Sequence, residues 1–430
     1  MEKITIKPRR LSGSVTIPPS KSLGHRGIIS AALSRGVSKI TNIQFSKDII
    51  ATIEIMRMLG ATIKINKEDL IIDGRNIFLN SSNQLQFQCN ESGSTLRFLI
   101  PIALVKDGEY IFEGKGKLVS RPLNSYYEIF EKKGIEYFTH EGGLPLKVRG
   151  SLTSGIYRLR GDISSQFITG LLFALPLLDG NSEIVVTTDL ESRGYIDLTL
   201  DVLKDFGINI VNEDYKVFKI KGNQKYISKD FEIEGDYSQG AFYLVAGAIG
   251  CNIRCKGLRK DSLQGDKEII NILKRMGCTI KETDEYIEAL PSKLKGIDID
   301  VSQCPDLVPI LGVLGSMAEG TTRILNGRRV RIKESDRLYA TTRELSKIGA
   351  KIIELEDGLI IEGVGEFQGG EVDSHNDHRI AMALAIAATR AKGGIIINNP
   401  MAIEKSYPNF FEDYKNLGGD VSEFNNRNKG

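Results

Sequence analysis

A pattern that occurs six times along the 430 residues constrains this chain more than any other feature of its sequence. In each copy a helical run ends in a glycine and a short strand follows, at a period of roughly 70 residues. The glycines are Gly60, Gly134, Gly207, Gly277, Gly349 and Gly418. Glycine suits the end of a helix because the chain often turns there through a left-handed conformation. The sequence therefore predicts one structural unit repeated six times.

A second series, of polar clusters, opens an apolar helical run in each repeat. The clusters are Ser20-Lys21-Ser22, Ser92-Gly93-Ser94, Ser164-Ser165-Gln166, Tyr237-Ser238-Gln239, Asp306 and Asn376-Asp377-His378-Arg379. The start of a helix offers unpaired N–H donors and the positive end of the helix dipole. Six such starts brought together would bind anionic ligands strongly.

The first repeat shows what each unit is expected to contain. Residues 21–34 and 48–59 have the pattern of helices, residues 37–42 that of a strand, and residues 61–65 with 70–73 that of a hairpin. Four later helices are apolar nearly all round: 168–178, 241–249, 307–317 and 380–389. Such helices are buried on every side, which a helix enclosed by its own sheets achieves.

The length of the chain predicts two domains of about 200 residues each, because one hydrophobic core does not usually grow beyond ~300 residues. We expect three repeats in an N-terminal lobe, 20–229, and three in a C-terminal lobe made of 1–19 and 230–430. The first strand, residues 3–8, is expected to join the C-terminal lobe, whose last repeat ends in a truncated hairpin after Gly418. Short hinges between the lobes predict closure around a ligand.

Bulk composition excludes several classes of function. A net charge of +2 gives no field that favours nucleic acid or a membrane surface. No apolar run approaches the ~20 residues of a membrane span, and residues 1–5 lack the pattern of a leader peptide. The five cysteines show no C-x-x-C spacing, so neither a disulfide framework nor a zinc site is expected. We therefore expect a cytoplasmic protein.

Residues 18–26 carry the strongest local signal for a ligand. Two prolines lead into Ser20, which is suited to cap a helix, and Lys21, Ser22 and Arg26 follow within the first turns. Two cations and a hydroxyl at a helix start suit a phosphate or carboxylate. A basic helix that is merely capped is the alternative, and the spacing of a P-loop is absent.

Two further segments suggest acid–base chemistry or salt bridges. Lys333 and Arg337 are four residues apart, which predicts that they share one helix face next to Glu334. Asp306 stands at the mouth of an apolar helix, where it is either a cap or a general base that faces the ligand. The segment Asp373–Arg379 combines carboxylates and imidazoles but lacks an H-x-x-x-H pair, so no metal site is expected.

Taken in order, the motifs resemble those of the 5-enolpyruvylshikimate-3-phosphate (EPSP) synthases over nearly the whole chain. They are Pro19-Ser20-Lys21-Ser22 with Arg26, Gly93-Ser94-Thr95 with Arg97, Arg121-Pro122, Gly161–Gln166, Lys333–Leu338 and Asn376–Met382. The resemblance implies a two-lobed inside-out α/β barrel of six βαβαββ units. It also implies transfer of the enolpyruvyl group of phosphoenolpyruvate to the 5-hydroxyl of shikimate 3-phosphate, in aromatic amino acid biosynthesis, without cofactor or metal and by a monomer.

The resemblance also implies roles for individual residues. Shikimate 3-phosphate would be held by Lys21, Ser22, Arg26, Ser164, Ser165, Gln166, Ser192, Tyr195, Asp306 and Lys333. Phosphoenolpyruvate would be held by Lys21, Gly93, Arg121, Gln166, Arg337, Arg379 and Lys405. Asp306, Glu334 and Lys21 would be the catalytic groups. The chemistry is consistent, because two phosphates and two carboxylates require cations, and addition followed by elimination requires paired proton donors and acceptors.

Three positions depart from the common family pattern: Glu91, Phe98 and Arg329. They concern the region where the family binds phosphoenolpyruvate and the inhibitor glyphosate. One alternative is the related enolpyruvyl transferase that acts on UDP-N-acetylglucosamine. It carries a loop cysteine, absent here from residues 114–121, and a Lys-Asn pair where this chain has Lys21 and Ser22. A non-catalytic anion-binding protein of the same fold is the other alternative.

Overall fold

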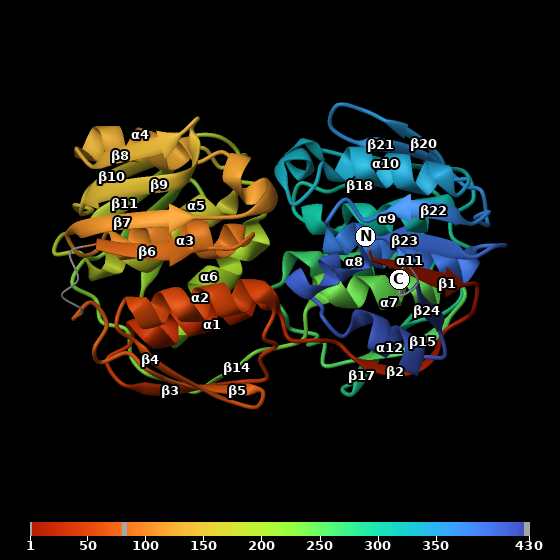
Figure 1. The fold of residues 1–430 in the computed structure, drawn as a ribbon, viewed down its shortest axis with the longest axis horizontal. Helices are drawn as coiled ribbons and strands as arrows, with labels where there is room; N and C mark the ends of the chain where they lie inside the picture. Colours follow the sequence, from red (N-terminus) through yellow and green to blue (C-terminus); the bar gives the residue numbers. More distant parts are fainter. Residues whose placement is uncertain (1, 80–83, 425–430) are drawn as a thin grey trace, which may run out of the picture. The chain divides into compact units, whose positions relative to one another are not determined.

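The computed structural model describes residues 2–79 and 84–424. Contacts divide the chain into two compact units (Figure 1). We call Pro19–Glu234 the N-terminal unit, and Met1–Pro18 with Gly235–Gly430 the C-terminal unit. Each unit has a hydrophobic core of its own, and no buried residue belongs to both cores.

The N-terminal unit contains three four-stranded sheets, in the strand orders β14-β3-β5-β4, β6-β7-β9-β8 and β10-β11-β13-β12. The first two strands of each order are parallel and the others antiparallel. The strands are β3 Val37–Thr41, β4 Thr62–Asn66, β5 Asp69–Asp73, β6 Gln84–Gln88, β7 Gly108–Glu113, β8 Glu136–His140, β9 Gly143–Gly150, β10 Gly155–Leu159, β11 Ser182–Val186, β12 Ile210–Glu213, β13 Val217–Ile220 and β14 Phe231–Glu232. The helices are α1 Lys21–Leu33, α2 Lys47–Met58, α3 Gly93–Ala103, α4 Asn124–Lys133, α5 Ser165–Ala174 and α6 Arg193–Asp205.

The C-terminal unit repeats this plan in three further sheets, ordered β16-β17-β15-β2, β18-β19-β21-β20 and β22-β23-β1-β24. The strands are β1 Lys3–Lys7, β2 Ser12–Thr16, β15 Asn252–Lys256, β16 Ile280–Glu282, β17 Tyr286–Ala289, β18 Asp298–Asp300, β19 Thr321–Leu325, β20 Lys351–Glu354, β21 Leu359–Glu362, β22 Gly370–Asp373, β23 Ile395–Asn398 and β24 Asp420–Phe424. The helices are α7 Tyr237–Ala248, α8 Glu268–Arg275, α9 Val308–Ser316, α10 Arg337–Lys347, α11 His378–Ala387 and α12 Phe410–Asn416.

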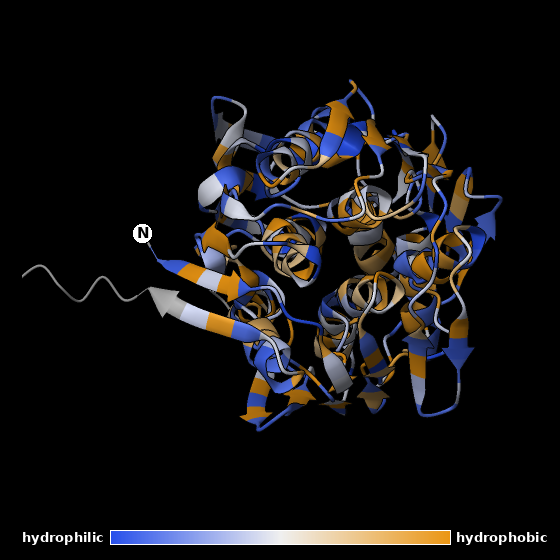
Figure 2. Cartoon of the chain, turned by 90° about the vertical axis from the view of Figure 1, so that its right-hand side faces the viewer, coloured by the Kyte–Doolittle hydropathy of each residue, from blue (hydrophilic) through white to orange (hydrophobic). Residues whose placement is uncertain are grey.

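One helix of each repeat is buried, as the apolar pattern predicts. All residues of α7, α9 and α11 are buried, as are all of α5 except Gln166. The strands outside them alternate polar and apolar residues, which Figure 2 shows as alternating blue and orange. This arrangement of helices inside and sheets outside is the inside-out α/β architecture that the resemblance implies. The six glycines that end the second helices all have positive φ, between 67° and 115°.

Strands distant in sequence complete three of the sheets. β1 pairs with β23 and β24, so the first strand of the chain supplies the strand that the truncated last repeat lacks. β2 pairs with β15, and β14 pairs with β3. The last pairing corrects the predicted boundary at 229/230, because β14 and the residues up to Glu234 belong to the N-terminal unit. Ser20 N–H donates to the Glu234 carbonyl at 2.8 Å, which joins the two ends of that unit.

Across the described ranges, no helix is long and apolar enough to cross a membrane. All five cysteines are free and buried. The same ranges hold no group of three or more His, Cys, Asp or Glu side chains arranged to hold a metal ion.

Candidate active site

The predicted site residues fall into two groups, one in each unit. The N-cluster consists of Lys21, Ser22, Arg26, Gly93, Arg121, Ser164, Ser165, Gln166, Ser192 and Tyr195. The C-cluster consists of Asp306, Lys333, Glu334, Arg337, Arg379 and Lys405. Most members stand at or next to the first turn of a helix, because the polar caps of the repeats place them there.

Lys21 is the first residue of α1, and Ser20 caps this helix by accepting from the Leu23 N–H. The Lys21 ammonium lies 2.9 Å from Oδ2 of Asp48, which is in the first turn of α2 and is almost fully buried. Asp48 is not among the residues that the motifs predict for the site. In the sequence, Asp48 follows the cap residue Ser46 by two positions, and an acidic residue there is common at the start of any helix. This pattern therefore does not distinguish a site residue. The ion pair fixes the position of the ammonium group.

Arg26 connects α1 to α6. Its Nη1 donates to the Ser22 carbonyl at 2.7 Å, its Nη2 to the Tyr195 carbonyl at 2.9 Å and its Nε to Thr199 Oγ1 at 2.9 Å. Burial lowers the pKa of Arg26 to about 10, so the guanidinium is charged at neutral pH. The guanidinium also lies 5.3 Å from the ring centre of Phe98, one of the positions that depart from the family pattern.

Gln166 is oriented by hydrogen bonds to α3. Its Nε2 donates to Ser94 Oγ at 3.0 Å, and its Oε1 accepts from Arg97 Nη1 at 2.8 Å. Arg97 is buried, and it was quoted in a motif without a role. Ser164 caps α5 through the Gln166 N–H. The structure therefore brings together the caps of the second and third repeats.

Gly93 allows the guanidinium of Arg121 to approach the start of α3. A Cβ atom at Gly93 would lie 2.8 Å from Arg121 Nη1 and 3.2 Å from its Cζ, both too short for an undisturbed contact. Arg121 is buried at the end of a 3₁₀ turn, Gly116–Ser120. Within the same unit, Ser192 stands at the start of α6 with φ of 55°, and its side chain is buried.

Asp306 is the centre of the C-cluster. Its Oδ1 accepts from Arg337 Nη1 at 2.7 Å, and its Oδ2 accepts from Arg379 Nη2 at 3.0 Å. Lys333 Nζ lies 3.5 Å from Oδ1. The cap position of α9 is Leu307, which forms no side-chain cap hydrogen bond, so Asp306 precedes the cap position that one interpretation of the sequence gave it. The carboxylate is 14% exposed and remains within reach of a ligand.

Arg337 connects three carboxylates although its side chain is only 1% exposed. Besides Asp306, it donates to Glu334 Oε2 at 2.8 Å and to Asp377 Oδ2 at 2.9 Å. Burial alone would lower the pKa of Arg337, but Asp377, Glu334 and Asp306 together raise it above its ordinary value. Asp377 is fully buried and also caps α11. Burial would raise the pKa of Asp377, but the charges of Arg337 and His378 and the hydrogen bond from Arg337 together lower it.

Lys333 does not share a helix face with Arg337, contrary to the prediction from their spacing. It follows the 3₁₀ turn Arg328–Ile332 in an extended conformation, because Asp336 caps α10 and begins that helix at Arg337. Lys333 nonetheless reaches Asp306 from this turn. Burial lowers the pKa of Lys333 to about 8. Arg329, in the turn, donates to the Ser302 carbonyl at 3.1 Å.

Arg379 and Lys405 complete the C-cluster. Arg379 donates to Ser238 Oγ at 3.0 Å, so the polar cluster of the fourth repeat, which had no assigned ligand, contacts a predicted ligand residue. Lys405 donates to the Asn376 carbonyl at 2.6 Å. The C-cluster thus holds carboxylates and cations in direct contact. Such an arrangement can both bind anions and transfer protons.

A fold of six such sheets, with cations and carboxylates at the starts of its buried helices, defines an enolpyruvyl transferase. The family model of EPSP synthase (3-phosphoshikimate 1-carboxyvinyltransferase) matches residues 6–414. The chain is 56% identical to the 3-phosphoshikimate 1-carboxyvinyltransferase of Clostridium perfringens, over 97% of this chain and 99% of that protein. It is 54% identical to that of Clostridium novyi, over 99% of each.

A solved structure of EPSP synthase from Acinetobacter baumannii superposes with a TM-score of 0.83 at 26% identity, covering 98% of this chain and all of that chain. The protein belongs to the EPSP synthase family and is a 3-phosphoshikimate 1-carboxyvinyltransferase, as its motifs predict.

Proposed function

We propose that the N-cluster and the C-cluster divide the work of enolpyruvyl transfer from phosphoenolpyruvate to the 5-hydroxyl of shikimate 3-phosphate. Shikimate 3-phosphate is bound by Lys21, Ser22, Arg26, Ser164, Ser165, Gln166, Ser192, Tyr195, Asp306 and Lys333. Phosphoenolpyruvate is bound by Lys21, Gly93, Arg121, Gln166, Arg337, Arg379 and Lys405. The buried guanidinium groups of Arg26, Arg121, Arg337 and Arg379 support this assignment, since arginine binds phosphate and carboxylate through paired N–H donors.

The reaction proceeds by addition and then elimination. In the addition, the 5-hydroxyl loses its proton and its oxygen bonds to C2 of phosphoenolpyruvate, while C3 gains a proton. In the elimination, the bond from C2 to the phosphate oxygen breaks, phosphate leaves, and C3 gives up a proton to restore the double bond. Asp306, Glu334 and Lys21 are the groups that donate and accept these protons.

The observation that best supports this mechanism is the position of Asp306. Its carboxylate is held between Arg337 and Arg379 rather than at the N-terminus of α9, and both it and Glu334 are partly exposed, at 14% and 18%. Asp306 and Glu334 present carboxylate oxygens among these cations, and a carboxylate is one of the groups that can act as a general base. A scaffold that only binds anions has no need of carboxylates among its cations.

Release of inorganic phosphate tests the proposal. The purified protein is expected to release phosphate only when phosphoenolpyruvate and shikimate 3-phosphate are both present. Release with UDP-N-acetylglucosamine as the acceptor would instead support the related transferase, and no release with either acceptor would support a non-catalytic anion-binding protein.

A substitution at Asp306 tests its role separately. Asp306→Ala is expected to lower turnover by about 100-fold or more, since general acid–base catalysis contributes ~10²–10⁴-fold. Binding of shikimate 3-phosphate, measured by calorimetry, is expected to change far less. Equal losses of turnover and affinity would show that Asp306 only supports the binding site.

We further propose that the protein works as a monomer in the cytoplasm. Its five free cysteines are consistent with a reducing compartment. Light scattering after size-exclusion chromatography is expected to give the mass of one chain, 47.6 kDa.

A further inference from the structure

Glu344 is a buried carboxylate of the C-terminal unit that belongs to neither cluster. It lies on α10, two turns after Arg337, and its side chain is 1% exposed. Its Oε2 accepts from the Asp373 N–H at 2.8 Å and from Lys347 Nζ at 2.7 Å, and its Oε1 lies 2.8 Å from His375 Nε2. Burial would raise the pKa of Glu344, but these contacts lower it to about 2.

Two of these contacts bind Glu344 to the turn that joins β22 to α11. In this turn His375 and Asn376 have φ of 52° and 54°, a conformation that residues other than glycine adopt rarely. Two consecutive residues of this kind require support from neighbouring groups. Glu344 supports the turn through its contacts with Asp373 and His375. Ser374, a residue of the turn, adds support because its hydroxyl donates to the Asn399 carbonyl at 2.8 Å.

This turn also positions two groups that contact the C-cluster, the Asn376 carbonyl and the Asp377 carboxylate. The Asn376 carbonyl accepts from Lys405, and the next residue, Asp377, accepts from Arg337. Helix α10 therefore fixes both partners of the Arg337–Asp377 ion pair. It carries Arg337 directly, and through Glu344 it holds the turn that presents Asp377.

We propose that Glu344 and His375 are positioning residues for phosphoenolpyruvate binding, which they serve by holding the turn 373–376 and, through it, Arg337 and Lys405. This inference rests on the proposed assignment of Arg337 and Lys405 to phosphoenolpyruvate. Neither Glu344 nor His375 touches the substrate. Their loss changes the placement of the two cations, so the larger effect is expected on phosphoenolpyruvate binding.

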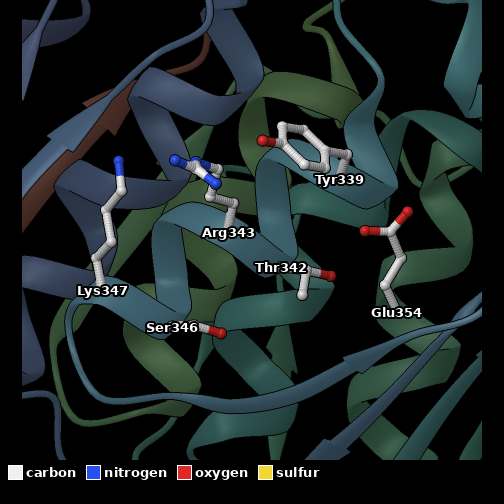
Figure 3. Close-up of a pocket in the computed structure, with 6 residues that line it drawn as sticks. All are labelled: Tyr339, Thr342, Arg343, Ser346, Lys347 and Glu354. Atoms are coloured by element: carbon white, nitrogen blue, oxygen red, sulfur yellow. The ribbon is translucent and has the colours of Figure 1, made fainter.

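A matched control is available on the same helix. Lys347 contacts both carboxylate oxygens of Glu344, but it does not hold the turn. It lines a shallow groove of about 550 Å³ together with Tyr339, Thr342, Arg343, Ser346 and Glu354. Figure 3 shows Lys347 and Arg343 on one side of this groove and Glu354 on the other. Lys347→Met therefore perturbs Glu344 from the side that faces solvent.

The test is steady-state kinetics with each substrate varied. Glu344→Ala is expected to raise KM for phosphoenolpyruvate by about tenfold, with a smaller change in kcat, because displaced cations weaken binding by about the value of one hydrogen bond to a charged group. Glu344→Gln, which keeps an oxygen for the Asp373 N–H, is expected to recover most of the loss. His375→Phe is expected to raise KM for phosphoenolpyruvate by less than Glu344→Ala, and Lys347→Met to stay within twofold of the parent chain.

The outcomes separate this inference from the proposed function. If the parent chain releases no phosphate, the proposed function fails. If the parent is active and His375→Phe has the same KM for phosphoenolpyruvate as Lys347→Met, the positioning role is refuted. It is also refuted if Glu344→Ala raises KM for both substrates equally, or lowers only the melting temperature. His375→Phe keeps the test decisive if Glu344→Ala does not fold.

Discussion

Replacement of Arg337 by methionine tests how much the buried ion pair between Arg337 and Asp377 contributes to the free energy of unfolding. The Arg337 side chain is 1% exposed, the Asp377 side chain is fully buried, and Arg337 Nε lies 2.9 Å from Asp377 Oδ2. Arg337→Met keeps an apolar stem that reaches about as far as Nε, and it leaves the Asp377 carboxylate without its guanidinium. Removing one partner of a buried pair costs about 3–5 kcal/mol. For a unit of about 200 residues this corresponds to a fall in melting temperature of about 6–20 °C.

The pH dependence of this loss follows from the pKa of Asp377. In the parent chain the pKa is lowered, so Asp377 stabilises the fold above the unfolded value of about 3.9, and this stability disappears as the pH falls through the folded pKa. In Arg337→Met burial dominates and raises the pKa. The carboxylate then destabilises the fold at neutral pH, and protonation relieves that penalty at lower pH. The difference in stability is therefore expected to shrink between pH 7.5 and pH 5.

Urea unfolding followed by circular dichroism at both pH values measures the effect. Asp377→Asn in the Arg337→Met background is the control, because asparagine still caps a helix but carries no charge. This double variant is expected to recover more than half of the loss. A loss below about 1 kcal/mol, or one that neither pH nor asparagine reduces, would refute the account, since breaking a buried pair costs several times that.

Two further predictions concern the substrate-binding residues. Gly93→Ala is expected to raise KM for phosphoenolpyruvate several-fold, because its Cβ would lie 2.8 Å from Arg121 Nη1 and displace the guanidinium. The melting temperature is expected to stay within a few degrees of the parent value, since Nη1 is the flexible end of a side chain. Unchanged kinetics would show that Arg121 does not bind this substrate. Since the pKa of Lys333 is about 8, kcat/KM for shikimate 3-phosphate is expected to fall as the pH rises through that value. Lys333→Arg, which stays charged, is expected to remove this fall, and a fall that persists in Lys333→Arg would assign the titration to another group.

The local sequence was sufficient to predict the elements of each repeat. In the first repeat, the observed helices α1 and α2 begin and end within one residue of the predicted ranges. Caps such as Ser20 and Ser92 are local signals, because a side-chain oxygen two or three residues before a free N–H is enough to start a helix. Burial of the apolar helices followed equally from their composition.

Contacts between distant residues were not predictable in this way. The spacing of Lys333 and Arg337 suggested one helix face, but the cap Asp336 starts the helix later and separates them. Asp48 and Asp377 had the appearance of ordinary residues near helix starts, and their ion pairs with Lys21 and Arg337 depend on how two helices pack. The pairing of β14 with β3, which moved a predicted boundary, is likewise a contact across about 190 residues.

The sequence by itself determined the repeat, the two groups of three units and the chemical type of the site, since each depends on residues close together in the chain. The family also followed from the sequence, because its motifs occur in order. Only the tertiary structure showed which groups surround Asp306. Its local context suggested a helix cap as readily as a base, and neither interpretation indicated that Arg337 and Arg379 contact it from α10 and α11. A charged side chain takes its role from the groups that pack against it, and those groups are set by the fold rather than by its neighbours in sequence.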